Sequence, residues 1–116
     1  MQRMRSSTET KLASAAPVFA ALGDPTRLDI VARLCASGPQ SIVRLTDGAR
    51  VTRQAVTKHL QALAKAGVVR SVREGRERIW ELQPHRLADA GRYLAQISTQ
   101  WDEAIQRLRA FVEEEP

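Results

Sequence analysis

The last third of the 116-residue chain carries one long helical pattern whose apolar stripe outgrows the core that the rest of the chain offers to cover it. From about His85 to Glu113, just after Pro84, apolar residues recur every seven positions in two series. They are Leu87, Leu94, Trp101 and Leu108, and Ala90, Ile97, Ala104 and Phe111. Such series occupy the a and d positions of about four heptads, which predicts a helix that pairs with another helix.

Pairing with a second copy of the chain is the simplest way to cover this stripe. We therefore expect a dimer whose seam includes Leu87, Leu94, Ile97, Trp101 and Leu108. The alternative is a helix that folds back on its own domain. In that case Trp101 would be buried within a single chain.

Upstream of this helix, start and stop signals divide the chain into shorter helices. Residues 15–22 predict an apolar helix that ends at Gly23, with Val18, Phe19 and Leu22 on its buried side. Asp24 and Pro25 then have the residue types of an N-cap and a first helical position. The helix that follows presents Leu28, Val31, Leu34 and Cys35 at helical spacing. Residues 41–46 predict a short third helix, because Asp47 and Gly48 break the pattern.

The next helix has one apolar face and one polar face. Thr52 is its expected N-cap, and Gly67 ends it. Its core side is expected to hold Ala55, Val56, Leu60, Leu63 and Ala64, and its outward side Arg53, Gln54, Thr57, Lys58 and Gln61. A helix that enters the major groove contacts base edges from its first turns with side chains of this kind. The pattern therefore predicts a recognition helix.

Beyond Gly67, the segments VVRSVRE and RERIWEL alternate apolar with polar residues on either side of Gly75. Alternation around a glycine predicts a β-hairpin. Its tip carries Arg73, Arg76 and Arg78, which suit contacts with phosphates or with the minor groove. Three helices followed by a basic hairpin make a winged helix-turn-helix, so the expected fold class is mainly α with a small β-hairpin.

The charge distribution agrees with a nucleic-acid partner. The net charge is +5, and residues 50–78 alone hold eight basic and two acidic side chains, a net of +6. Residues 84–116 hold four basic and six acidic side chains, a net of −2. A local positive field attracts a polyanion such as double-stranded DNA. The plainer interpretation is a solvated basic face without a partner.

Other classes of protein find little support in the sequence. Cys35 is the single cysteine, which excludes an internal disulfide and fits a reducing cytoplasm. No run of about 18 apolar residues occurs, so we expect no membrane segment. Neither a nucleophile with a histidine partner nor a nucleotide-binding motif is present, which argues against an enzyme and against a cofactor.

The stretches LGDPTRLDIVARL and VTRQAVTKHLQALAKAGVVRSVREGRERIWEL resemble the ArsR family of winged helix-turn-helix repressors over roughly residues 17–83. The resemblance implies a homodimer, paired through its first and last helices, that binds an inverted-repeat operator and blocks transcription. The implied DNA contacts come from Arg53, Gln54, Thr57, Lys58 and His59 of the recognition helix and from Arg73, Arg76 and Arg78 of the wing. The implied pairing surface includes Val18, Phe19 and Leu22.

The chain departs from the metal-sensing members of that family. The helix before the recognition helix reads SIVRL, without a thiol or an imidazole, and the last helix offers only His85 and Asp89 one turn apart. Two ligands fall short of a closed tetrahedral zinc site. We therefore expect a regulator without a metal switch.

The expected organisation is a flexible N-terminus over residues 1–12, a DNA-binding domain over 13–83 and a dimerisation helix over 84–116. Two alternatives to a simple operator-occupying repressor stay open. One is a ligand- or thiol-gated regulator of the same fold. The other is an interaction adaptor that uses the coiled-coil seam and carries its basic charge incidentally.

Overall fold

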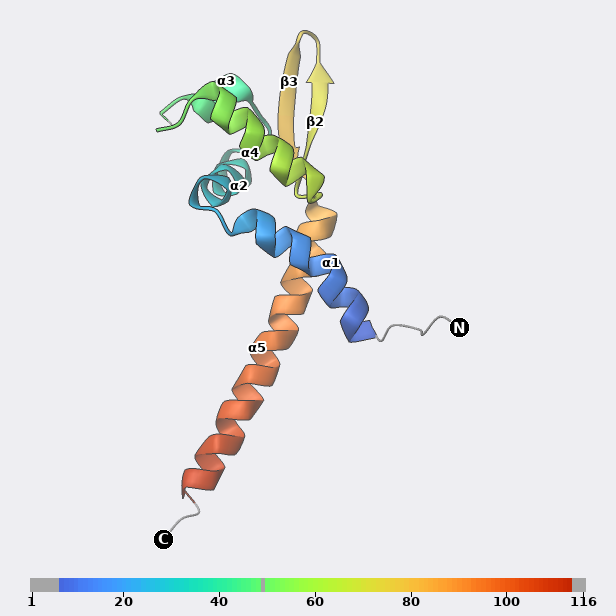
Figure 1. Ribbon diagram of the computed structural model, residues 1–116, viewed down its shortest axis with the longest axis vertical. Coiled ribbons are helices and arrows are strands. Elements are labelled where there is room, and N and C mark those ends of the chain that lie inside the picture. The colour runs from blue at the N-terminus through green and yellow to red at the C-terminus, as the bar shows by residue number, and fades with distance from the viewer. Residues whose placement is uncertain (1–6, 49, 114–116) are drawn as a thin grey trace.

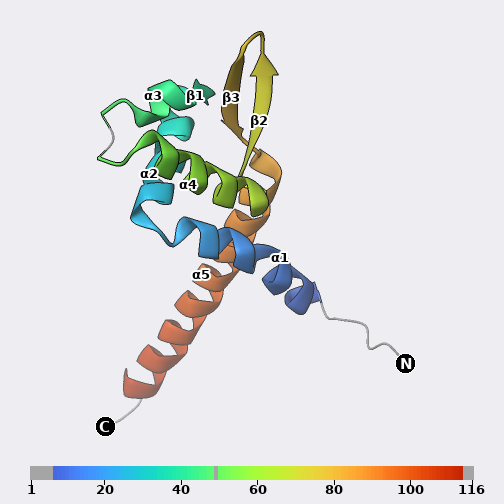
Figure 2. The ribbon, with the colours of Figure 1, turned by 45° about the horizontal axis from the view of Figure 1, so that its top comes forward.

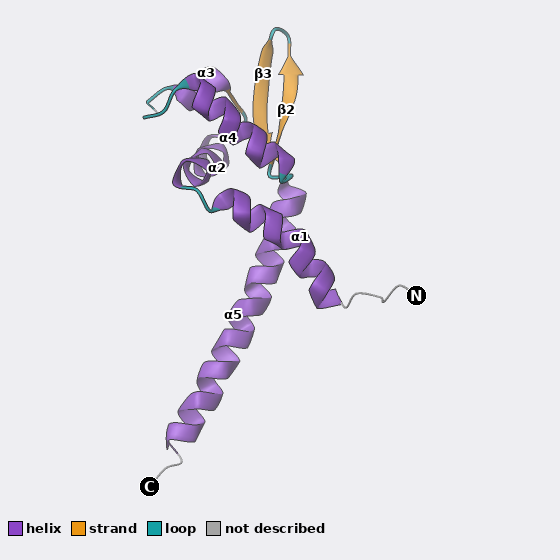
Figure 3. Cartoon of the chain, viewed as in Figure 1, coloured by secondary structure: helices purple, strands orange, loops and turns teal. Residues whose placement is uncertain are grey.

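The computed structural model describes residues 7–48 and 50–113 of the chain. In order along the chain, its elements are α1 (Ser7–Leu22), α2 (Pro25–Ser37), β1 (Gln40–Ser41), α3 (Ile42–Thr46), α4 (Arg53–Lys65), β2 (Val69–Glu74), β3 (Glu77–Leu82) and α5 (Pro84–Glu113). Figure 1 shows α2, α3, α4 and the β2–β3 hairpin gathered at one end, with α5 extending away from them. Helices predominate over the small sheet (Figure 3), which confirms the predicted fold class.

Capping residues set where α2 and α4 begin. A carboxylate oxygen of Asp24 accepts a hydrogen bond of 3.0 Å from the backbone N–H of Arg27. The hydroxyl of Thr52 accepts one of 3.1 Å from the N–H of Ala55. After α4, Gly67 adopts a φ of 80°, which glycine reaches without the steric cost that a side chain would add. These observations confirm the predicted starts of α2 and α4 and the predicted end of α4.

The strands form one antiparallel sheet in the order β1-β3-β2. In the hairpin, Glu74 lies opposite Glu77, and Gly75 is the first residue of the two-residue turn, with a φ of 62°. A type II′ turn places glycine at this position. The sequence did not predict β1, which pairs with the middle of β3 (Figure 2). A two-residue strand is too short to show the alternation on which strand prediction depends.

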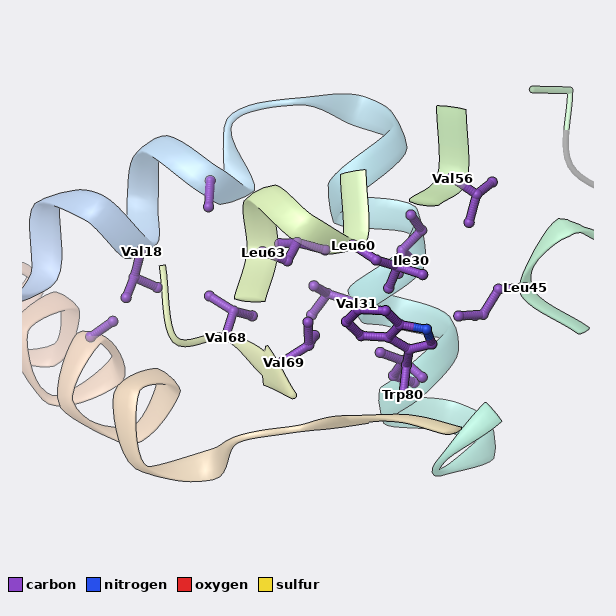
Figure 4. Packing of buried hydrophobic residues seen from close by; sticks show 13 residues of the cluster. Val18, Ile30, Val31, Leu45, Val56, Leu60, Leu63, Val68, Val69 and Trp80 are labelled. Atoms are coloured by element: carbon purple, nitrogen blue, oxygen red, sulfur yellow. The ribbon is translucent and has the colours of Figure 1, made fainter. Parts of the chain in front are cut away.

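A single cluster of buried apolar side chains joins the helices to the sheet. Figure 4 shows side chains from α1, α2, α4 and the sheet converging on it. The cluster consists of Val18, Ala21, Ile30, Val31, Leu34, Leu45, Val56, Leu60, Leu63, Val68, Val69, Trp80 and Ala90. The three buried residues of α4 recur at intervals of four and three, as the sequence predicted for its core side.

The buried face of α2 is rotated from the predicted one. Ile30, Val31 and Leu34 are buried, whereas Leu28 is 53% exposed and Cys35 is also exposed. The helical spacing of Leu28, Val31, Leu34 and Cys35 predicted that all four face the core, and for Leu28 and Cys35 this was wrong. Packing of α2 against α1, α4 and β3 selects the face that contains Ile30.

Helix α1 begins earlier than the sequence indicated. It starts at Ser7, whereas the predicted helix started at residue 15 and flexibility was expected through residue 12. Residues 7–14 contain neither glycine nor proline, and half of them are strong helix formers, so a helix can extend through them without a regular apolar stripe. Residues 1–6 of the expected flexible segment lie outside the described residues.

The first half of α5 packs against α1. Ala90 is buried, Leu87 is half-buried, and the rings of Phe19 and Tyr93 lie 6.4 Å apart. Val18 is completely buried in the chain's own core, so it has no surface left for a second copy. That placement differs from its predicted role in pairing, because Val18 faces the core, whereas Phe19 and Leu22 stay partly accessible.

The second half of α5 leaves the body of the molecule. Trp101, Leu108 and Phe111 are each about two-thirds exposed, at 67%, 65% and 66%. The radius of gyration is 19.3 Å, whereas a compact chain of this length would have one of about 13 Å. The helix therefore does not fold back, and Trp101 is not buried within one chain.

Removing one core side chain tests this packing. We expect Leu60→Ala to lower the free energy of unfolding by about 2–5 kcal/mol, because Leu60 is fully buried and the change leaves a cavity. The matched control, Leu28→Ala, should change it by less than about 0.5 kcal/mol, since Leu28 is exposed. Urea unfolding at one fixed protein concentration measures both, and similar losses for the two variants would contradict the assigned face of α2.

Candidate nucleic-acid interface

Helix α4 presents polar side chains from its first two turns. Arg53, Gln54 and Lys58 are exposed, and the first buried residue of the helix is Val56. Figures 1 and 2 both place α4 and the hairpin at the end opposite the C-terminal end of α5. The described surface therefore combines an exposed helix start with a basic hairpin on one end of the molecule.

Two predicted contact residues of α4 are placed differently from the other three. Thr57 is half-buried, and its hydroxyl donates a hydrogen bond of 2.9 Å to the backbone carbonyl of Arg53. His59 is also half-buried, and its Nδ1 lies 3.9 Å from a carboxylate oxygen of Asp24. His59 therefore faces the start of α2, and the outward surface of α4 is formed by its longer polar side chains.

Asp24 is stabilised in its charged form at this contact. The hydrogen bond from the backbone N–H of Arg27 is the main cause that holds the pKa of Asp24 below its ordinary value. Burial opposes it, and the guanidinium charge of Arg27 adds a smaller lowering effect. The side chain of Arg27 points elsewhere, because its Nε donates to the backbone carbonyl of Ala21 at 2.5 Å. Arg27 therefore joins the end of α1 to the start of α2.

The hairpin tip concentrates positive charge. Arg73 and Arg78 are directly opposite each other across the two strands, and Arg76 lies in the turn between them. Within residues 7–48 and 50–113, none of these three guanidinium groups forms a salt bridge. Arg70, farther from the tip, differs because its Nε lies 2.6 Å from a carboxylate oxygen of Glu81. Glu74 and Glu77 also face each other at the tip, so the three arginines leave a net charge of +1 there, which favours an anionic partner.

One further basic residue was not among the predicted contacts. Arg44 is exposed on α3 and lines a groove with Gly48 and Arg53, between the end of α3 and the start of α4. In helix-turn-helix proteins the helix before the recognition helix crosses the DNA backbone. In the sequence, Arg44 is a single basic residue in a five-residue helix. That signal is too weak to predict a DNA contact by itself.

The two predicted metal-ligand types of α5, His85 and Asp89, lie beside each other, and Asp89 also contacts an arginine. Nε2 of His85 lies 3.6 Å from Asp89, and Asp89 also accepts a hydrogen bond from Arg92. The described part of the chain contains no group of three or more histidine, cysteine, aspartate or glutamate residues that could hold a metal ion.

Among the helices of the described part of the chain, none is both long and apolar enough to cross a membrane.

Comparisons with known proteins agree on one family. The helix-turn-helix domain family matches residues 22–72. An HTH-type transcriptional regulator of Methanocaldococcus jannaschii is 37% identical over 65 residues, which cover 56% of this chain and 73% of the relative. The HTH-type transcriptional repressor SmtB of Mycobacterium tuberculosis is 38% identical over 77 residues, which cover 66% of this chain and 56% of that repressor.

Solved structures extend the similarity over most of the chain. An ArsR-like transcriptional regulator from Rhodococcus is 36% identical, with a TM-score of 0.75 over 91% of this chain and 99% of that one. A homodimeric winged helix-turn-helix DNA-binding domain from Mycobacterium bovis is 25% identical, with a TM-score of 0.61 over 89% of this chain and 92% of that one. With its exposed recognition helix and basic wing, this chain belongs to the ArsR family of DNA-binding, winged helix-turn-helix transcriptional regulators.

Proposed function

We propose that the chain acts as a homodimer that occupies an inverted-repeat operator and represses transcription, without a metal switch. The observation that carries the proposal is the exposed apolar stripe of α5, which lies at the end opposite α4 and the wing. A second copy paired along this stripe would leave both recognition helices free to contact DNA. Their expected separation is about 34 Å, one turn of the double helix.

Apolar side chains of this size are rarely left in water on a helix that has a regular seam. Leu94, Trp101, Leu108 and Phe111 are each more than half exposed, and they recur at the predicted a and d positions. Burial of a large apolar side chain stabilises an assembly by about 1.5–3 kcal/mol. The homodimeric relative from Mycobacterium bovis supports the same conclusion.

The proposal divides the DNA-facing residues by role. Arg53, Gln54 and Lys58 would meet base edges or nearby phosphates from α4, while the wing arginines would contact phosphates on either side of the groove. Thr57 can still accept a hydrogen bond, although its own proton is used within the helix. The placement of His59 against Asp24 leaves its side chain only 24% exposed.

Occupancy of the operator would block transcription, and the relative named SmtB is described as a repressor.

We propose residues 13–83 as the DNA-binding unit and residues 84–116 as the dimerisation helix, of which 114–116 lie outside the described residues. The cytoplasm is the proposed location. Metal independence is supported by the donor set, since His85 and Asp89 are two ligands one turn apart, no second histidine follows in α5, and α3 supplies no ligand.

Selection of bound fragments from random duplex DNA tests the function directly. We expect the purified protein to enrich an inverted repeat and to bind it equally well with and without a chelator. Gln54→Ala should relax the preference at one base pair in each half-site, at a cost of about 1–3 kcal/mol. Gln61→Ala is the matched control, because Gln61 is exposed on the same side of α4 two turns later.

Enrichment of a single half-site would contradict the proposed dimer. Loss of binding in the presence of the chelator would contradict a function without a metal switch. Binding that ignores sequence altogether would favour the adaptor. Equal changes for the two glutamine variants would show that the first turn of α4 does not carry the base contacts.

The unpaired wing arginines should govern the salt dependence. Arg76→Ala is expected to weaken binding to all sequences and to reduce the slope of log affinity against log salt concentration by about 0.9. Arg70→Ala is the control, since Arg70 is already paired with Glu81. Fluorescence anisotropy titrations at several salt concentrations measure both slopes, and an equal change for the two variants would argue against the wing-tip contact.

The α5 stripe should hold the dimer together. Trp101→Glu is expected to give a monomer, because pairing would bury an unpaired carboxylate. Gln106→Glu adds the same charge outside the a and d positions and should leave the dimer intact. Sedimentation velocity over a range of concentrations distinguishes the species, and a Trp101→Glu protein that stays dimeric would show that pairing uses another surface.

A further inference from the structure

Arg33 belongs to α2, yet its guanidinium group contacts the turn that leads into α4. Its Nη1 donates to the backbone carbonyls of Leu45 and Asp47, at 3.4 Å and 3.2 Å. Its Nε lies 3.1 Å from a carboxylate oxygen of Asp29, one helical turn earlier. A single side chain therefore connects α2 to the end of α3 and to the start of the turn.

These two carbonyls are groups that a short helix leaves without partners. Helix α3 spans only Ile42–Thr46, and the last carbonyls of a helix have no amide to accept from within it. A cation at a helix C-terminus is also favoured by the helix dipole. Arg33 supplies both a donor and a positive charge there, from a helix that Ile30 and Leu34 anchor in the core.

The turn matters because it helps to position the start of α4. Val56 is the first buried residue of α4, so the position of Arg53 and Gln54 depends on the Thr52 cap, on the partly buried Val51 that packs against the core before it, and on the preceding turn. Groups that read a ligand must be held within roughly 0.5 Å of their working position. A displaced turn would move Gln54 relative to the bases while leaving the wing where it is.

We propose that Arg33 is a positioning residue for sequence reading: it fixes the turn before α4 so that the first turn of α4 meets the base edges, and it does not itself contact DNA. This inference rests on the proposed function. The ion pair with Asp29 orients the guanidinium group, and it contributes little stability because Asp29 is 62% exposed. The contacts with the two carbonyls are what hold the turn.

Paired binding measurements test this role. Arg33→Ala should lower affinity for the selected inverted repeat about tenfold and change affinity for random duplex DNA by less than about twofold. Arg33→Lys should recover part of the loss, because an ammonium group can donate to one of the carbonyls. Arg92→Ala is the control, since Arg92 forms a similar ion pair with Asp89 on α5, away from the turn.

Two results would overturn the inference. Equal losses on selected and random DNA would mean that Arg33 contacts a phosphate, and unchanged affinity on both would mean that its contacts have no role in reading DNA. Thermal unfolding of each variant identifies a loss of fold, and recovery by Arg33→Lys keeps the test informative if the alanine variant is unstable.

Hydrogen exchange in the DNA-free protein gives an independent measurement. Amides in the segment 45–55 should exchange faster in the Arg33→Ala protein than in the wild type or in the Arg92→Ala protein. Unchanged exchange would overturn the inference even if the protein binds its operator as proposed. If the wild-type protein shows no sequence preference but Arg33→Ala still speeds exchange in this segment, the proposed function is contradicted. The contact between Arg33 and the turn would nevertheless be established.

Discussion

Burial of one face of α4 is the constraint on which the end of the molecule that carries α4 and the hairpin depends. Val56, Leu60 and Leu63 are each at most 1% exposed. Because these residues recur with the period of a helix, burying them directs the opposite side of α4 outward. The same thirteen residues therefore supply the centre of the core and the outer surface that can read a groove.

The basic residues of the chain divide into those that hold the fold and those that remain available. Arg33 and Arg27 donate to backbone carbonyls, and Arg70 pairs with Glu81. Arg73, Arg76 and Arg78 form no salt bridge within the described ranges. Of the eight basic residues in 50–78, Arg70 is thus partly neutralised by Glu81, whereas the wing-tip arginines keep their charge available to an anion.

Much of this fold could be predicted because its signals are local. The caps at Asp24 and Thr52 and the turn at Gly75 depend on residues within three or four positions of each other. The face of α2 was not predictable in this way. Leu28, Val31 and Cys35 form as regular a stripe as the buried one, and packing against α1, α4 and β3 decides between them; α4 and β3 lie more than fifteen residues away in the sequence.

The candidate site shows the same division. An outward position for Arg53, Gln54 and Lys58 follows from the period of α4 alone. The orientation of His59 toward Asp24 does not, because it depends on how α4 crosses the start of α2. The two contacts of Arg33 with the turn are also long-range in sequence, and an arginine in the middle of a helix carries no pattern that would reveal them.

The long exposed stripe of α5 has a consequence for the response of a cell. Under the proposed function, a chain that must pair before two recognition helices can span one operator links DNA occupancy to its own abundance by mass action. Below the dissociation constant of the pair, the amount of dimer rises with the square of the chain concentration. Synthesis and dilution of the protein alone would then produce a steep change in gene expression, with no effector molecule involved.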